Sequence, residues 1–260
     1  MAREININSD MAEGFGAYDI GNDAALVKII NSANVACGFH AGDASVMHRF
    51  VAQAKAAGIS IGAHPGFPDL QGFGRRPMHM KASEIEYITA YQIGALQAMA
   101  CYAGLKVTHV KAHGALGNMA MVDEAYALAI GRAAKTIDPS LIFLAHHGSQ
   151  LQRAAGTLGL RMALEGYADR QYEDDGMLAS RAIAGTVIRD AGTAAAQALR
   201  LASDGEVVSR HGKVLKVKID SICVHGDEPT AVAVATAVRT SLAAAGLTLL
   251  PLDRMQLKHG

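Results

Sequence analysis

The 260-residue chain contains no tryptophan, and its three cysteines are scattered without a CxxC pair. An odd, unpaired set of cysteines argues against a disulfide framework and for a reducing compartment. Lysine plus arginine and aspartate plus glutamate balance at 24 each, so the formal net charge is +0, and no basic tract stands out. Nucleic acid and anionic membrane are therefore not expected as partners. A net charge near zero weakly favours self-association, which leaves a homo-oligomer open.

The chain also lacks the hydrophobic segments that direct proteins into or across membranes. Glu4 falls early in an N-terminus that has no apolar h-region, so we expect no signal peptide. No run of about 18 apolar residues predicts a membrane span. These absences together predict a cytoplasmic protein.

Several familiar catalytic templates are missing. There is no GxSxG motif, so serine-hydrolase chemistry has no support, and no GxGxxG motif opens a helix after a strand. Residues 131–136 resemble the end of a P-loop but lack its leading glycine and fall within a predicted helix. A nucleotide would therefore have to bind by another route. The zinc signatures HExxH and paired CxxC are absent as well.

What the chain does contain is a repeated pattern in which a short apolar run ends in histidine, lysine or aspartate beside glycine. In residues 34–43 the run stops at Gly38, and His40 and Asp43 follow in a turn of small residues before a helix predicted over 44–57. The pattern recurs at His64, at Lys111 and His113, and at His225 and Asp227. A strand, a glycine-bearing turn and a helix place reactive side chains at the carboxyl end of a parallel strand.

The number of such units predicts a barrel. Strands are predicted to end near residues 10, 37, 63, 110, 145, 164 and 224. About seven βα units in 260 residues fit one α/β domain over residues 1–260, a seven-stranded (β/α) TIM-like barrel, with a β-hairpin insertion near 205–218. A long helix is predicted over 83–103, with Ser83 as N-cap and Glu86 completing a capping box.

In this architecture the carboxyl ends of all strands open on one face, so polar residues far apart in the sequence converge. The residues expected there are Asp10, Glu13, His40, Asp43, His64, Lys111, His113, Glu165, His225 and Asp227. A lone histidine at a strand end more often hydrogen-bonds a backbone carbonyl. Ten such residues together predict an active site.

The residue types suggest more than one chemistry. Asp10 and Glu13 could act as a general base or bind a cation, and two carboxylates in one pocket would raise the pKa of one of them. Lys111 could stabilise a developing oxyanion or a phosphate. The side chains of ligand type for Zn²⁺ or another transition ion are His40, His64, His113 and Asp43, with the three histidines as the candidate metal ligands. Their spacing fits no zinc signature, so a metal stays open.

Residues 65–80 form a loop that is too long and too rich in glycine and aromatic residues to be a bare connector. Its Arg75 and Arg76 would suit a carboxylate or a phosphate through bidentate hydrogen bonds. A solvated basic pair is an equal alternative.

Taken together, these stretches resemble the LamB/YcsF family, the A subunits of bacterial ATP-dependent 5-oxoprolinases. The resemblance runs from Ile7 to about Leu242 and rests on residues 8–16, 32–43, 61–66, 72–76, 91–96, 113–116, 168–170 and 223–227. Residues 8–13 read NSDMAE where the family pattern resembles NCDLGE, and residues 111–118 read KAHGALGN where it resembles KPHGALYN. The polar positions are retained in both.

The resemblance implies a barrel related to glycoside hydrolases and sugar deacetylases. It also implies hydrolysis of 5-oxo-L-proline to L-glutamate, with ATP, accompanying Mg²⁺ and partner subunits B and C. Asp10 or Glu13 would activate water, and Lys111 with a histidine such as His113 would stabilise the oxyanion. The residues expected to bind substrate or nucleotide are Asn8, Asn34, His40, Asp43, His64, Arg75, Arg76, Glu165, Arg170, His225 and Asp227.

Two alternatives stay open at this point. One is a metal-dependent deacetylase or carbohydrate hydrolase, which would be active without ATP or partners. The other is a non-catalytic scaffold within a larger complex.

Overall fold

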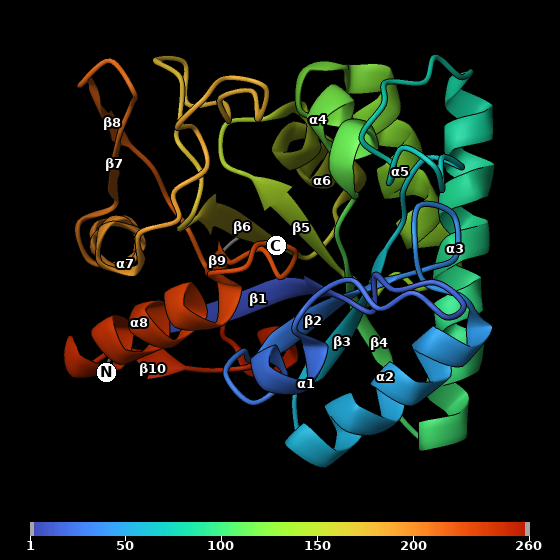
Figure 1. The fold of residues 1–260 in the computed structure, drawn as a ribbon. Coiled ribbons are helices and arrows are strands. Elements are labelled where there is room, and N and C mark those ends of the chain that lie inside the picture. The colour runs from blue at the N-terminus through green and yellow to red at the C-terminus, as the bar shows by residue number, and fades with distance from the viewer. Residues whose placement is uncertain (1–2, 258–260) are drawn as a thin grey trace.

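Seven parallel strands close into a barrel with helices around it in the computed structural model, which describes residues 3–257 (Figure 1). The strands follow the order β1-β2-β3-β4-β5-β6-β9, and β9 pairs back onto β1. The predicted seven-stranded α/β barrel is therefore confirmed. Residues 1–2 and 258–260 of the predicted domain lie outside the described residues.

Most helices alternate with the strands along the chain. The barrel strands are β1 (Glu4–Met11), β2 (Ser32–Ala36), β3 (Ser60–His64), β4 (Val107–Val110), β5 (Ile142–His146), β6 (Met162–Tyr167) and β9 (Ser221–Cys223). The α-helices are α1 (Asp23–Leu26), α2 (Ala44–Ala57), α3 (Ala82–Ala103), α4 (Gly114–Val122), α5 (Glu124–Ile137), α6 (Gln150–Leu158), α7 (Ala191–Leu199) and α8 (Ala231–Ala244).

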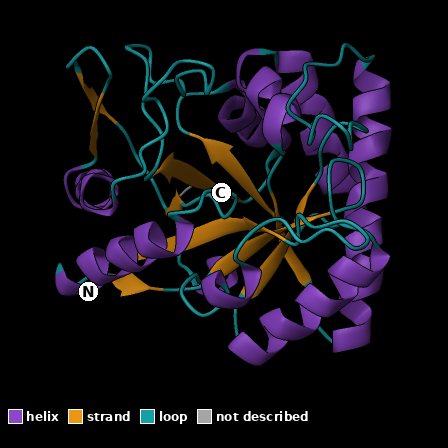
Figure 2. Cartoon of the chain, in the orientation of Figure 1, coloured by secondary structure: helices purple, strands orange, loops and turns teal. Residues whose placement is uncertain are grey.

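The remaining elements are short. They are the π-helical turn η1 (Arg200–Asp204), the antiparallel hairpin β7 (Glu206–Val208) and β8 (Val214–Lys216), the strand β10 (Thr248–Leu249) and the 3₁₀ turn η2 (Leu252–Arg254). A long connection over residues 168–190, drawn as loop in Figure 2, separates β6 from α7. Among the helices of residues 3–257, none combines the length and apolar character that a membrane span requires.

The start of α3 differs from the expectation. Its N-cap is Lys81, whose backbone N–H donates to the Glu84 carboxylate at 2.8 Å. The capping box expected at Ser83 and Glu86 is therefore wrong by two residues. Glu84 reaches back to the free N–H of the first turn, and this bond fixes the helix start earlier in the chain.

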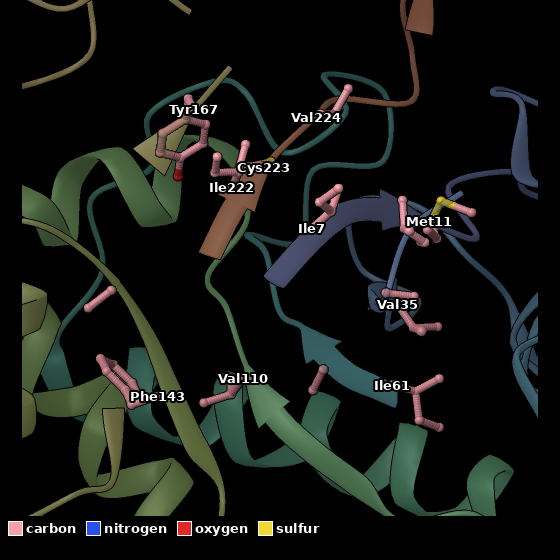
Figure 3. Packing of buried hydrophobic residues seen from close by; sticks show 14 of the residues in the cluster. Ile7, Met11, Val35, Ile61, Val110, Phe143, Tyr167, Ile222, Cys223 and Val224 are labelled. Carbon is pink, nitrogen blue, oxygen red and sulfur yellow. The ribbon is translucent and has the colours of Figure 1, made fainter. Parts of the chain in front are cut away.

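The outward face of the strands forms the main hydrophobic core. Ile7, Val35 and Ile61 lie on the neighbouring strands β1, β2 and β3 (Figure 3). They belong to one buried cluster with Phe50 of α2 and Leu96 of α3. Fully burying each such side chain contributes about 1.5–3 kcal/mol. This layer between strands and helices therefore holds the barrel together.

The inward face, by contrast, is rich in polar side chains. Asn6 Nδ2 donates to Ser32 Oγ at 2.8 Å, and Ser32 Oγ lies 2.7 Å from Ser60 Oγ. Nearer the carboxyl ends of the strands, Asn8 Nδ2 donates to Glu165 Oε1 at 2.8 Å. Barrels of this class usually fill their interior with branched apolar residues. Here hydrogen-bonded polar side chains fill the interior instead and lie beneath the residues at the carboxyl ends of the strands.

Candidate active site

A pocket of about 540 Å³ opens at the carboxyl ends of the barrel strands. The predicted site residues that line it are Asp10, Arg75, Lys111, His113, Arg170 and His225. They lie at the ends of β1, β3, β4, β6 and β9 or in the connections that follow, so five separate parts of the barrel contribute. Convergence at this face of the barrel is what the parallel topology predicted.

Lys111 occupies the floor of the pocket with a side chain that is only 6% exposed. Its Nζ lies 3.1 Å from Asp10 Oδ1 and 3.0 Å from Glu165 Oε1. The same ammonium donates to Asn8 Oδ1 at 3.4 Å and to Cys223 Sγ at 3.1 Å. Burial alone would lower the pKa of Lys111, but the Asp10 carboxylate and its other neighbours raise it well above the usual value. The lysine is therefore a fixed positive charge.

Asn34 orients the Asp10 carboxylate from β2. Its Nδ2 donates to Asp10 Oδ1 at 2.9 Å and to Asn8 Oδ1 at 2.7 Å, while its Oδ1 lies 3.1 Å from His109 Nε2. Burial lowers the pKa of His109 to about 3, so its ring is neutral and Nε2 donates to the Asn34 oxygen. This second layer fixes which oxygen of Asp10 faces Lys111.

Three histidines surround the Asp10 carboxylate, near the end of β1, and the Glu13 carboxylate in the connection that follows. His64 Nε2 lies 3.3 Å from Asp10 Oδ2, and His113 Nδ1 and His40 Nε2 lie 3.3 Å and 3.2 Å from Glu13 Oε1. The His40 and His113 rings stack at 3.6 Å. Burial first, and then neighbouring charges, hold the pKa of both stacked rings well below the usual value. Ligand atoms of Glu13 and the three histidines lie within 4.8 Å of one another.

The two carboxylates differ in their affinity for protons, as expected of a pair in one pocket. Burial and then the Asp10 charge raise the pKa of Glu13 to about 7. Burial acts the same way on Asp10, but His64 and Lys111 outweigh it and hold the pKa of Asp10 well below its usual value. Environments that separate two pKa values in this way are typical of acid–base sites.

A strained turn sets the position of Glu13. Ala12 has φ +58°, a left-handed conformation that favours glycine, and its N–H donates to Asp23 Oδ2 at 2.9 Å. Strain of this kind collects at functional sites, where the surroundings hold it in place.

The loop after β3 closes tightly over the histidines. Gly74 has φ +61°, and a Cβ there would lie 2.7 Å from His40 Cβ and 2.8 Å from His113 Cδ2. The preceding carbonyl, that of Phe73, accepts a hydrogen bond from His113 Nε2 at 2.8 Å. Only glycine fits at position 74, and the loop fixes the orientation of His113.

The rim of the pocket carries arginines. Arg75 Nη2 lies 2.5 Å from Asp227 Oδ2, and Arg181 Nη1 lies 3.9 Å from the same oxygen. Arg170 is 6% exposed and donates from Nη2 to the Ala179 carbonyl, while its buried Nε has no partner among the described residues. A ligand with a carboxylate would complete this cationic wall.

Two of the predicted site residues, Asp43 and Arg76, have structural roles in a helix cap and a loop. The Asp43 carboxylate caps α2 by accepting from the Ser45 and Val46 N–H groups at 2.7 and 2.9 Å. Arg76 pairs with Asp69 across the loop, and its side chain is 64% exposed. Neither Asp43 nor Arg76 lines the pocket, so their place in the site stays a prediction. Capping and loop closure account for their positions.

Several residues of the site were not predicted from the sequence. Tyr167, Arg181 and Cys223 contact the pocket or Lys111, and Asp169 holds His225 at 2.9 Å. His146 ends β5 and is buried beside Tyr167. The strand-end pattern would have found His146 had β5 been predicted one residue longer. Arg181 carries no such signal, because it lies deep in the long loop before α7.

Known proteins resemble this chain over almost its whole length. The chain is 53% identical over 252 residues to the A subunit of 5-oxoprolinase from Rhodopseudomonas palustris (strain BisB5), covering 96% of this chain and 99% of that one. It is 52% identical to an A subunit of 5-oxoprolinase from Bradyrhizobium diazoefficiens, the one numbered 2, with 97% and 99% coverage.

Solved structures show the same relationship. The crystal structure of the lactam utilization protein from Thermus thermophilus matches with a TM-score of 0.91 and 40% identity, covering 96% of this chain and 100% of that one. The catalytic domain of a peptidoglycan N-acetylglucosamine deacetylase from Eubacterium rectale shares the fold alone, with a TM-score of 0.54 and 11% identity over all of this chain and 93% of that one. The family model described as LamB/YcsF matches residues 5–257. The chain belongs to the LamB/YcsF family.

Proposed function

We propose that this chain is the A subunit of an ATP-dependent 5-oxoprolinase and that its pocket opens the ring of 5-oxo-L-proline to give L-glutamate. Relatives more than 50% identical over nearly the whole chain are named as A subunits of 5-oxoprolinase. The observation that carries the proposal is the placement of the Lys111 ammonium and the Asp10 carboxylate 3.1 Å apart at the floor of an arginine-rimmed pocket. A carboxylate-bearing lactam needs both features.

The arginine rim would recognise the substrate carboxylate. Arg75 and Arg170 line the pocket and offer guanidinium donors, and the buried Nε of Arg170 lacks a partner among the described residues. A buried donor of this kind costs free energy until a ligand satisfies it. The rest of the small lactam ring would then point toward the pocket floor.

The chemistry at the floor follows from the charges there. An unstrained γ-lactam closes readily, so its amide must be activated before water can attack, for instance by phosphorylation of the carbonyl oxygen. Water would then add to the ring carbon, the ring C–N bond would break, and that oxygen would leave with inorganic phosphate. The Lys111 ammonium would stabilise the negative charge on it during these steps. Asp10 lines the pocket and would orient the attacking water, and Glu13 behind it is the second carboxylate that could take up a proton.

ATP would act in the assembled enzyme rather than through a phosphate-binding loop of this chain. The sequence has no P-loop or Gly-rich dinucleotide motif. We therefore assign ATP, with its Mg²⁺, to the complex, and we expect subunits B and C to supply the activation step. This chain would contribute the hydrolytic pocket.

The test is glutamate release from 5-oxoproline, with and without ATP, by the chain alone and after addition of subunits B and C. We expect glutamate only when ATP and all subunits are present. If the folded chain gives no glutamate in any mixture, the proposal is overturned for this substrate. Release of acetate from an N-acetylated sugar without ATP would support a metal-dependent deacetylase instead.

A further inference from the structure

The hydrogen bonds of His64 and His113 fix which of their ring nitrogens carry lone pairs. His64 Nδ1 lies 2.8 Å from the Lys111 carbonyl oxygen, and His113 Nε2 lies 2.8 Å from the Phe73 carbonyl oxygen. A carbonyl oxygen only accepts, so both of these nitrogens must donate. When both rings are neutral, His64 Nε2 and His113 Nδ1 are acceptors, yet they face each other at 3.0 Å.

Two carboxylate oxygens join this pair of acceptors. Asp10 Oδ2 lies 3.3 Å from His64 Nε2, and Glu13 Oε1 lies 3.3 Å from His113 Nδ1. All four side chains are 10% exposed or less. Among the described residues, Glu13 Oε1 has a further donor in His40 Nε2 at 3.2 Å, but the two ring nitrogens and the two carboxylate oxygens still repel one another. A cation bound between them removes this repulsion in a buried site.

The buried charges are unbalanced by the amount that a divalent ion would supply. Asp10, Glu13 and Glu165 carry three carboxylates in the cluster, and Lys111 is the cation that contacts two of them. Two negative charges remain when Glu13 is ionised. A single divalent cation between Asp10 and Glu13 neutralises them.

The distances between the acceptors fit a coordination shell. With metal–nitrogen bonds of about 2.1 Å, neighbouring ligand atoms in a tetrahedral shell lie about 3.4 Å apart. Three of the six separations within the set, those of His64 from His113 and Asp10 and of His113 from Glu13, are 3.0, 3.3 and 3.3 Å. The carbonyls that hold the far nitrogens of His64 and His113 are the outer-shell partners that metal-binding histidines usually have.

We propose that Asp10, Glu13, His64 and His113 bind one divalent transition-metal ion of the zinc class. Histidine with carboxylate is a ligand set that such ions accept and that Mg²⁺ does not favour. Asp10 and His113 also line the pocket, so one side of the ion faces the substrate space. There it would polarise a bound oxygen. The inference concerns the same side chains as the proposed function but rests on their geometry alone.

His40 is excluded from the ligand set, although its residue type had suggested it. Its ring lies 4° from parallel with that of His113, with the ring centroids 3.6 Å apart, so the lone pairs of the two rings lie in parallel planes that do not meet at one ion. His40 Nε2 lies 3.2 Å from Glu13 Oε1 and is placed to donate to it. We therefore assign His40 as a positioning residue for Glu13.

The test is metal binding by the chain alone, without ATP, lactam or partner subunits. The chelator-treated protein is titrated with Zn²⁺ by calorimetry, and Co²⁺ is added separately to record its visible absorption. We expect one ion per chain, and a Co²⁺ spectrum of a site with mixed nitrogen and oxygen ligands. Because no turnover is measured, failure here leaves the proposed lactam hydrolysis standing, and failure of that activity leaves this site standing.

Variants of the individual histidines distinguish metal ligands from residues that only lie near the ion. His64→Ala and His113→Ala should each weaken Zn²⁺ binding by more than about 100-fold, whereas His40→Ala should keep the stoichiometry with a loss of about 10-fold. His79→Ala, which removes an exposed histidine, is the matched control and should bind like the wild type. Binding by His64→Ala that equals the control would overturn the site. A wild-type protein that binds neither Zn²⁺ nor Co²⁺ would also overturn the site, since protons would then neutralise the cluster. This second result does not depend on the folding of any variant.

Discussion

Lys111 shows how one buried charge can serve both stability and chemistry. Its ammonium contacts Asp10 and Glu165, and the three side chains are at most 10% exposed. A buried pair is weak evidence for net stabilisation, but removing one partner leaves an uncompensated charge and is costly. The same ammonium would lie beside the lactam oxygen. One residue therefore has two separable effects.

Lys111→Met should lower the free energy of unfolding by about 3–5 kcal/mol, because two carboxylates lose their counter-ion. It should also lower glutamate formation by the assembled enzyme by about 100-fold or more, because the oxyanion loses its stabilising charge. Urea unfolding and a glutamate assay measure the two effects. Lys106→Met, which replaces an exposed lysine, should change neither. Near-normal turnover in a folded Lys111→Met enzyme would remove the lysine from the mechanism.

Asp23 makes a second prediction, about pH. Burial raises its pKa from 3.8 to about 6, against the opposing effect of the Ala12 N–H bond. A raised folded-state pKa means that the folded protein binds the proton more tightly than the unfolded chain does. The stability associated with the protonated form is therefore present below about pH 4 and is lost as the pH rises through 6.

Asp23→Asn removes this titration and keeps an oxygen that can accept from Ala12. The stability of the variant relative to the wild type should therefore rise by up to about 3 kcal/mol between pH 4 and pH 7. Urea unfolding of both proteins across this range gives the difference. Buried histidines titrate in both proteins, so they cancel in the comparison. A difference that stays flat with pH would show that Asp23 has an ordinary pKa.

At the scale of the elements, the β3–α3 loop decides which of two neighbouring arginines can reach a ligand. Asp69 accepts from the Gly72 N–H at 3.0 Å and pairs with Arg76, which fixes Arg76 on the outside of the loop. Arg75 is left on the pocket side and pairs with Asp227. The two residues form a natural matched pair for mutation.

Arg75→Ala should raise the KM for 5-oxoproline about 10-fold or more, because a charged hydrogen bond to a carboxylate contributes about 1.5–3 kcal/mol. Arg76→Ala should leave KM unchanged and have little effect on stability, since its side chain is largely exposed and solvent screens the pair. Steady-state kinetics of the assembled enzyme measure both. Equal effects of the two substitutions would contradict the assignment of Arg75 to the substrate.

The α2 N-terminus supplies the opposite case, a residue at a strand end with a structural role. Asp43→Ala removes the bonds to two helix N–H groups and should cost about 1 kcal/mol of stability while leaving turnover unchanged. Asp43→Asn keeps an accepting oxygen and should lose less. A loss of turnover without a loss of stability would return Asp43 to the site.

The sequence predicts the elements with clear patterns and misses those defined by contacts. The apolar runs and glycine turns around His40 and His64 predict their strands and the face on which the histidines lie. Helix α4 gives no such signal, since no side chain caps it and it begins directly after His113. Sequence alone could not separate Arg75 from Arg76, because the bond from Asp69 across the loop decides their directions.

The barrel combines an apolar layer between strands and helices with a polar interior. The polar interior could not be predicted from the sequence. The alternation of polar Asn6 and Asn8 with apolar residues predicts the strand β1, but it does not tell on which side of the sheet the polar face lies. The closed barrel turns that face inward, where Ser32, Ser221 and Glu165 satisfy the amides. Closure depends on β9 pairing with β1, a contact between segments far apart in the chain.

The central claim at this scale is that the barrel pocket, and not a partner, carries out the hydrolysis. The most direct measurement compares complexes rebuilt from subunits B and C with either the wild-type chain or Asp10→Asn, which keeps the size of the side chain but removes its charge. Co-purification reports assembly, and the glutamate and ADP formed report turnover. We predict that both complexes assemble and that Asp10→Asn loses glutamate formation by about 100-fold or more. Glutamate formation at the wild-type rate would show that this chain is a scaffold and that the chemistry lies elsewhere.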